Sequence, residues 1–142
     1  MNYSKNGLAL TESFEGCRLK AYQDSNGVWT IGYGHTQGVR KGMACTQAQA
    51  EAWLLQDVAW ATKTVNAVVK VQLTQSEFDA LTDFVFNVGS GNFEKSLLLH
   101  ALNLEEYDIA ANEFERWDKA GGKVVAGLLR RRVAERLLFI TR

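Results

Sequence analysis

Apolar residues recur every three or four positions along most of the 142-residue chain, a spacing typical of amphipathic helices. The first such segment covers residues 4–15 and stops at Gly16, a residue type that commonly ends a helix. A second segment begins at Thr46-Gln47-Ala48-Gln49, which has the form of a capping box. One long helix is predicted from there to Lys70, because an apolar stripe continues through Leu54, Val58, Ala61, Val65 and Val68.

A second capping box, Thr74-Gln75-Ser76-Glu77, predicts another helix that ends at Gly89. Shorter helices are predicted over residues 93–102, 105–117 and 128–139. We find no repeat and no long linker among these segments. We therefore expect one helical lobe of roughly residues 71–142, together with the N-terminal helix.

Between the first helix and the long one, the pattern changes to that of β-strands. Residues 19–23 alternate loosely, and residues 28–33 are rich in β-branched and aromatic side chains. The intervening Asp24-Ser25-Asn26-Gly27 is a strong turn signal. A β-hairpin is therefore predicted, in a small lobe of roughly residues 17–45. Strands and helices segregated in this way indicate an α+β fold, with a ligand cleft expected between the lobes.

Composition narrows the class of protein. With 46% hydrophobic residues and a net charge of zero, residues 1–142 are expected to form a single compact domain. The apolar runs are too short to cross a bilayer, and the N-terminus lacks the pattern of a secretory signal peptide, so we expect a cytosolic context. Cys17 and Cys45 flank the hairpin lobe and could approach each other there. Free thiols are nevertheless expected in that compartment, and no motif indicates a metal.

Three polar residues of the hairpin region could hydrolyse an acetal. Such a reaction needs a proton donor for the leaving oxygen and a group that directs water, which two carboxyl groups on opposite sides of the bond can supply. Glu15 at a helix end and Asp24 at a turn could face each other in this way, with Thr30 holding the water. The alternative is that Glu15 is only an ordinary residue at a helix end and Asp24 only a turn residue. The spacing by itself leaves the catalytic and the structural interpretations open.

Other chemistries fit less well. The chain has no GxSxG motif for serine catalysis, and GYGHTQG is not followed by the GK[ST] of a phosphate-binding loop. Arg130, Arg131 and Arg132 could contact nucleic-acid phosphates, but ten acidic residues between positions 73 and 118 oppose a broad basic footprint. Most aromatic residues are expected in the core, and Trp29 is the best candidate for an exposed one.

The segment FEGCRLKAYQDSNGVWTIGYGHT resembles the catalytic segment of phage-type lysozymes, glycoside hydrolase family 24. LTQSEFDALTDFVFNVGSGNF and RWDKAGGKVVAGLLRRRVAER resemble the central and C-terminal signatures of that family, so the resemblance covers essentially the whole chain. It implies a lysozyme-like catalytic domain in which Glu15, Asp24 and Thr30 are the catalytic residues. Relatives commonly have a proline before the GLxxRRR segment, where this chain has Ala126.

The implied activity is that of an inverting muramidase, which cleaves the β-1,4 bond between N-acetylmuramic acid and N-acetylglucosamine in bacterial peptidoglycan. Such an enzyme would be a cofactor-free monomer that neither binds nucleic acid nor inserts into membranes, held in the host cytoplasm until release to the cell wall. The alternative is a non-catalytic wall-binding module with the same fold. Four residues are further candidates for substrate contacts: Trp29, Thr36, Phe86 and Ser96.

The resemblance also implies supporting residues around the site. His35 is expected to pair with Asp57, because relatives place the histidine of the GxGH segment against an aspartate of the long helix in a similar Gln-Asp-Val context. One arginine among residues 130–132 is expected to point towards Glu15. Successive helical residues lie about 100° apart, so the three arginines cannot all do so.

Overall fold

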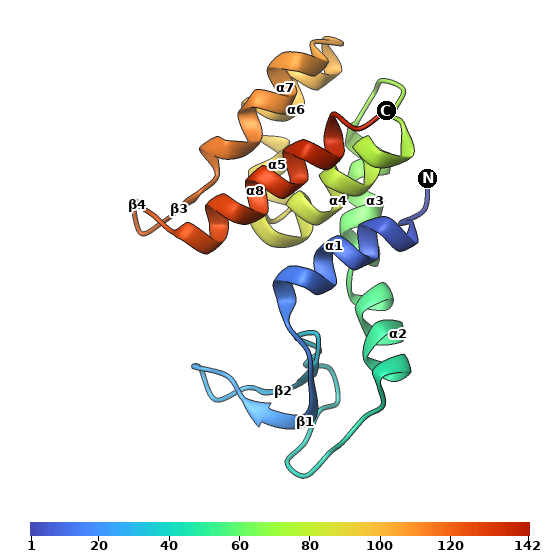
Figure 1. The fold of residues 1–142 in the computed structure, drawn as a ribbon, viewed down its shortest axis with the longest axis vertical. Coiled ribbons are helices and arrows are strands. Elements are labelled where there is room, and N and C mark those ends of the chain that lie inside the picture. Colours follow the sequence, from blue (N-terminus) through green and yellow to red (C-terminus); the bar gives the residue numbers. More distant parts are fainter. The chain divides into compact units, whose positions relative to one another are not determined.

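The computed structural model describes all 142 residues, which form eight α-helices, one 3₁₀-helix and two short antiparallel hairpins (Figure 1). This composition makes the chain an α+β protein. The chain divides into two compact units, one comprising Leu8–Ala59 and the other comprising Met1–Gly7 with Trp60–Arg142. Helix α1 (Lys5–Glu15) contributes residues to both units. None of the helices combines the length and apolar character needed to cross a membrane.

The smaller unit contains the predicted β-hairpin. Strand β1 (Arg18–Gln23) pairs antiparallel with β2 (Trp29–Gly32), and the pairing shifts register between Arg18 and Tyr22. Helix α2 (Gln47–Asp57) follows and packs against β2. A close approach makes this possible at Gly32, where φ is +65° and an added Cβ would lie 3.1 Å from the Cβ of Ala50. A larger residue at that position would push the strand and the helix apart.

The single long helix predicted after Thr46 is instead two helices. Helix α2 ends at Asp57 and α3 (Ala59–Val68) begins after Val58. The backbone of Val58 stays right-handed, at φ −81° and ψ −6°, and its N–H lies close to the carbonyls of both Leu54 and Gln56. The apolar stripe runs through this residue unchanged, so side-chain periodicity could not reveal a change confined to the backbone. The interruption falls next to the boundary between the two units.

The larger unit has a helical core built around helix α4 (Gln75–Val88), of which a continuous run from Glu77 to Val85 is buried. Helix α8 (Ala126–Phe139) packs along α4 (Figure 1). The rings of Phe93, Phe114 and Trp117 meet Phe84 edge-on, with centroids 5.4–6.1 Å apart. Such edge-to-face contacts add to the hydrophobic stabilisation of the core.

The remaining elements of the larger unit partly correct the predicted boundaries. Residues 93–102 contain two helices, α5 (Ser90–Glu94) and α6 (Leu97–Asn103), rather than one. Residues 105–117 hold α7 (Tyr107–Glu113) and a 3₁₀-helix (Phe114–Arg116). A second hairpin, β3 (Lys119–Ala120) with β4 (Lys123–Val124), was not predicted, because strands of two residues carry no periodic signal. The glycines between them both have positive φ, at +59° and +79°, which a tight turn requires.

Candidate active site

Helix α1 ends at the first candidate catalytic residue. Glu15 is its last residue and is half-buried. Gly16 follows in the left-handed conformation, at φ +66°, and its N–H bonds to the carbonyl of Glu12 at 3.4 Å. The left-handed residue that ends a helix is usually glycine, because glycine adopts this conformation without a steric penalty. The sequence Glu-Gly therefore stops the helix at the carboxylate and turns the chain towards the hairpin.

Asp24 is fixed by the turn between β1 and β2. Its Oδ1 accepts hydrogen bonds from the backbone N–H groups of Asn26, at 2.8 Å, and Val28, at 2.9 Å. Its own N–H donates to the carbonyl of Val28, and its carbonyl accepts from Gly27, both at 2.9 Å. The side chain therefore replaces the backbone partners that a tight turn leaves unsatisfied. The functional and the purely structural interpretations of Asp24 both agree with this geometry.

Thr30 lies on β2 and is 4% exposed. Its Oγ1 donates to the carbonyl of Val28 at 3.0 Å. A hydroxyl that donates in this way keeps its lone pairs as acceptors. Asp24 and Thr30 are both bonded to Val28, so these two candidates belong to one hydrogen-bonded turn.

The glycine-rich segment after β2 lies beside the first carboxylate. Gly34 has φ +81°, and a Cβ added there would lie 4.0 Å from Oε2 of Glu15. Main chain thus approaches the carboxyl group with no side chain in between. The geometry within the smaller unit therefore brings the end of α1 and the segment after the hairpin together.

The expected pairing of His35 with Asp57 is present. Nδ1 of the histidine lies 2.8 Å from Oδ2 of the aspartate, and the histidine side chain is only 8% exposed. The imidazole stacks on Trp53 with ring centroids 4.7 Å apart and planes 7° apart. The backbone of His35 exchanges two hydrogen bonds of 2.9 Å with Ile31. This residue therefore ties the glycine-rich segment to both β2 and α2.

Sequence reasoning missed a set of titratable groups around Tyr33. The hydroxyl of Tyr33 accepts a hydrogen bond of 2.7 Å from Nε2 of Gln47. Burial, followed by the charges of Glu12, Cys17 and Glu51, raises the pKa of Tyr33, whereas the bond from Gln47 opposes that rise. Burial and then the charge of Glu51 raise the pKa of Glu12. No motif could have revealed this set, because its members come from four separate segments.

The four predicted substrate contacts fall in different surroundings. Trp29 is half-buried on β2, and Thr36 is exposed directly after His35. Phe86 is half-buried on α4, with its ring centroid 6.0 Å from that of Trp60. Ser96 is buried and caps α6, where Oγ accepts from the N–H of Leu99 at 3.1 Å and donates to the carbonyl of Phe93 at 2.7 Å. The geometry of Ser96 therefore indicates a structural role.

The three arginines of α8 have different environments. Arg130 is exposed, whereas Arg131 and Arg132 are 5% and 0% exposed. Arg131 forms a two-pronged ion pair with Asp83 through Nε, at 2.9 Å, and Nη2, at 2.8 Å. Arg132 bonds to Glu135 at 2.7 Å. The approach of one of these arginines to Glu15 stays a prediction.

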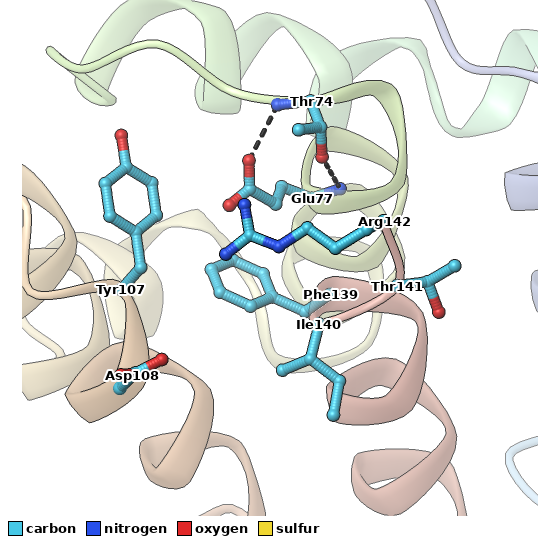
Figure 2. Close-up of a pocket in the computed structure, with 8 residues that line it drawn as sticks. All are labelled: Thr74, Glu77, Tyr107, Asp108, Phe139, Ile140, Thr141 and Arg142. Carbon is cyan, nitrogen blue, oxygen red and sulfur yellow. Dashed lines mark hydrogen bonds between the residues drawn. The ribbon is translucent and has the colours of Figure 1, made fainter.

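A small cavity lies at the end of α8, and Figure 2 shows its lining. The capping box of α4 forms one wall, where the N–H of Thr74 donates to Oε1 of Glu77 at 2.7 Å and Oγ1 of Thr74 accepts from the N–H of Glu77 at 3.1 Å. The cavity holds about 40 Å³, far less than a sugar-binding site needs. It contains none of the predicted site residues. No group of three or more His, Cys, Asp or Glu side chains is arranged to hold a metal ion.

The structure thus places the three candidate residues of a glycosidase at a helix end, in a hairpin turn and on the adjoining strand of an α+β fold. The chain belongs to the phage lysozyme family, whose model matches residues 12–135. It is 47% identical over 143 aligned positions to an endolysin from Acyrthosiphon pisum secondary endosymbiont phage 1, covering 98% of each chain.

Two solved structures share the fold. A point mutant of P22 lysozyme matches with a TM-score of 0.93 at 40% identity, over 99% of each chain. The muramidase domain of SpmX from Asticaccaulis excentricus matches with a TM-score of 0.91 at 39% identity, again over 99% of each chain. The α+β fold is therefore lysozyme-like.

Proposed function

We propose that this protein is a muramidase that hydrolyses the β-1,4 bond between N-acetylmuramic acid and N-acetylglucosamine in bacterial peptidoglycan and so lyses the host cell. The observation that carries the proposal is the constellation of Glu15, Asp24 and Thr30 within one compact unit of a phage-lysozyme chain. The endolysin and muramidase relatives support the same class of substrate. Such an enzyme acts on the cell wall after its release, and we expect it to work as a monomer.

Each residue has a separate role in the proposed reaction. Glu15 is the general acid that protonates the leaving oxygen of the glycosidic bond. The carboxylate of Asp24 is held by two backbone amides, and it stabilises the oxocarbenium-like transition state or helps to activate water. Thr30 accepts a hydrogen bond from the attacking water through lone pairs that its donation to Val28 does not use.

The proposed stereochemical outcome is inversion. A water molecule that attacks from the face opposite the leaving group needs room between the two carboxyl groups, typically about 6.5–9.5 Å. Product analysis by NMR during hydrolysis would show the α-anomer first if the reaction inverts. Initial formation of the β-anomer would instead show that the reaction proceeds with retention and would overturn the proposed outcome.

The experiment that tests the function is dye release from labelled peptidoglycan by the parent protein and by Glu15→Gln. The amide cannot donate the proton, so the rate should fall by at least about 10²-fold, within the usual range for a catalytic acid. Glu94→Gln is the matched control, because it makes the same change at an exposed position of α5.

Circular dichroism should show both variants folded like the parent. Near-normal hydrolysis by folded Glu15→Gln would overturn the assignment of the acid. No hydrolysis by the folded parent protein would favour a wall-binding module instead.

A further inference from the structure

The proposed reaction uses neither of the two cysteines, although both belong to the same compact unit as the three candidate catalytic residues. Cys17 is exposed and follows Glu15 by two positions. Cys45 is half-buried and directly precedes Thr46, the N-cap of α2. Both thiols are free in the structure. Backbone hydrogen bonds join the two segments that carry them.

The segment before α2 runs antiparallel to the start of β1. Lys20 and Ala44 form an antiparallel bridge, and the N–H of Cys45 donates to the carbonyl of Leu19 at 2.8 Å. Cys45 therefore stands directly opposite Leu19. Cys17 stands two positions before Leu19, directly before β1 begins at Arg18, so the two cysteines lie at adjoining ends of the two paired segments.

A side-chain contact supports this proximity. Sγ of Cys17 lies 3.7 Å from Oε1 of Gln47, the first residue of α2, which follows Cys45 by two positions. The two cysteines therefore lie close in space. Burial raises the pKa of Cys45, and the nearby charge of Cys17 raises it further, which agrees with two thiols close in space.

We propose that Cys17 and Cys45 form an intramolecular disulfide when the protein passes from a reducing to an oxidising environment. A disulfide needs its two Cβ atoms to lie about 3.8 Å apart. Any movement that this requires is local, because Cys17 and Cys45 lie outside helices and strands. Gly16 beside Cys17 has open space around it, so the end of α1 can adjust.

The bond forms by thiol–disulfide exchange with a small-molecule disulfide such as oxidised glutathione. The exposed thiol of Cys17 loses its proton, and its sulfur attacks one glutathione sulfur and releases the first glutathione thiolate. The thiolate of Cys45 then attacks Sγ of Cys17 in the mixed disulfide and releases the second. Two protein thiols are oxidised, one glutathione disulfide is reduced to two glutathione thiols, and the two protons end on the departing thiolates.

The disulfide would close a covalent loop from Cys17 to Cys45, and this loop contains Asp24, Thr30 and His35. One end of the loop lies two residues after Glu15. Closing such a loop limits the unfolded chain and stabilises the folded one. The stabilisation by the disulfide would act outside the cytoplasm, where the proposed function requires the enzyme to work. The expectation that the bond forms on release therefore rests on the proposed function. Its formation can be measured without any assay of the enzyme.

The test equilibrates the full-length protein in buffers dominated by reduced or by oxidised glutathione, followed by alkylation and intact mass measurement. We expect two labels in the reduced buffer. In the oxidised buffer we expect none, a mass lower by two hydrogen atoms, and a Cys17–Cys45 peptide under non-reducing conditions. The midpoint of thermal unfolding should be higher by roughly 5–10 °C in the oxidised form.

The control variants are Cys17→Ser and Cys45→Ser, each of which should lose the redox-dependent shift of the midpoint. Two labels in the oxidised buffer, stable glutathione adducts or a covalent dimer would overturn the proposal. A bond that forms without raising the midpoint would contradict its stabilising role. Absence of peptidoglycan hydrolysis in both redox states would refute the proposed function and leave the disulfide result unaffected.

Discussion

Asp24 owes its position to two backbone amides of its own turn, and this separates its structural role from its chemical one. An asparagine at this position keeps an Oδ1 that can accept from Asn26 and Val28, but it lacks the negative charge. We therefore expect Asp24→Asn to keep the fold and to lose about 10²- to 10³-fold in the rate of peptidoglycan hydrolysis. Dye release measures the rate, with Asp108→Asn, an exposed change on α7, as the control. Kinetics equal to the parent would leave Asp24 as a turn residue only.

His35 and Asp57 form the contact that holds the glycine-rich segment against α2. Their 2.8 Å bond is partly buried, and hydrogen bonds to charged groups typically contribute about 1.5–3 kcal/mol. We expect Asp57→Asn to lower the free energy of unfolding by about 1–2 kcal/mol. A urea-unfolding cycle of Asp57→Asn, His35→Gln and the double variant would isolate the pair. Strictly additive effects would show that the two side chains do not stabilise each other.

Helix starts in this chain are determined by short polar motifs. The predicted capping boxes at Thr46 and Thr74 are both confirmed, with reciprocal bonds between the cap and the third helical residue. Each motif satisfies two N–H groups that would otherwise lack partners at the helix end. Local motifs of this kind predict where a helix begins better than apolar periodicity predicts where it ends, as the interruption at Val58 shows.

Removal of the second cap should destabilise the larger unit. Thr74→Ala deletes the acceptor for the N–H of Glu77, and we expect a loss of about 1 kcal/mol in the free energy of unfolding. Thermal unfolding should show a midpoint lower by roughly 2–5 °C. Thr141→Ala, an exposed change after the last helix, should leave the midpoint within about 1 °C of the parent. Equal midpoints for the two variants would contradict the contribution of the cap.

The core of the larger unit contains a charged cluster, formed by Asp83, Arg131, Arg132 and Glu135, in which every side chain is buried. Nε and Nη1 of Arg132 have no hydrogen-bond partner, although its guanidinium lies 5.0 Å from the ring centre of Phe84. Burial raises the pKa of Glu135 well above its ordinary value of 4.5, and the hydrogen bond with Asp83 and the negative charge of Asp83 raise it further. The positive charges of Arg132 and Arg131 oppose this rise.

This cluster should make the stability of the protein depend on pH. Glu135 keeps its proton in the folded protein at pH values where the unfolded chain has lost it, so the folded state binds more protons. The contribution of Glu135 to the free energy of unfolding is fully present below its pKa in the unfolded chain, and it is lost as pH rises through its pKa in the folded protein. The loss amounts to about 1.4 kcal/mol for each tenfold difference in proton affinity between the two states. We expect Glu135→Gln, which mimics the protonated acid, to gain stability relative to the parent as pH rises from about 4 to about 8.

Urea unfolding of both proteins across that range measures the difference. A relative loss for Glu135→Gln with rising pH would show that the arginines govern the titration, and that Glu135 is ionised in the folded state.

Features that depend only on neighbouring residues could be predicted from the sequence. The capping boxes, the glycine that ends α1 and the Asp24–Gly27 turn are local, because their partners lie within four residues. The resemblance of motifs indicated the family and the pair of His35 and Asp57. The resemblance also named Glu15, Asp24 and Thr30 as the candidate catalytic residues, whereas their spacing by itself left the alternative open.

Contacts between distant segments could not be predicted from the sequence and are seen only in the folded protein. The charged cluster joins α4 to α8, and the set around Tyr33 joins four segments, so neither has a signature along the chain. The break at Val58 leaves the apolar stripe intact, and the hairpin at Lys119–Val124 is too short for a pattern. Cys17 and Cys45 are likewise 28 positions apart in the sequence, and the antiparallel bridge between Lys20 and Ala44 brings their segments together. Long-range packing sets these relations, because burial and hydrogen bonding act on distance in space rather than on distance along the chain.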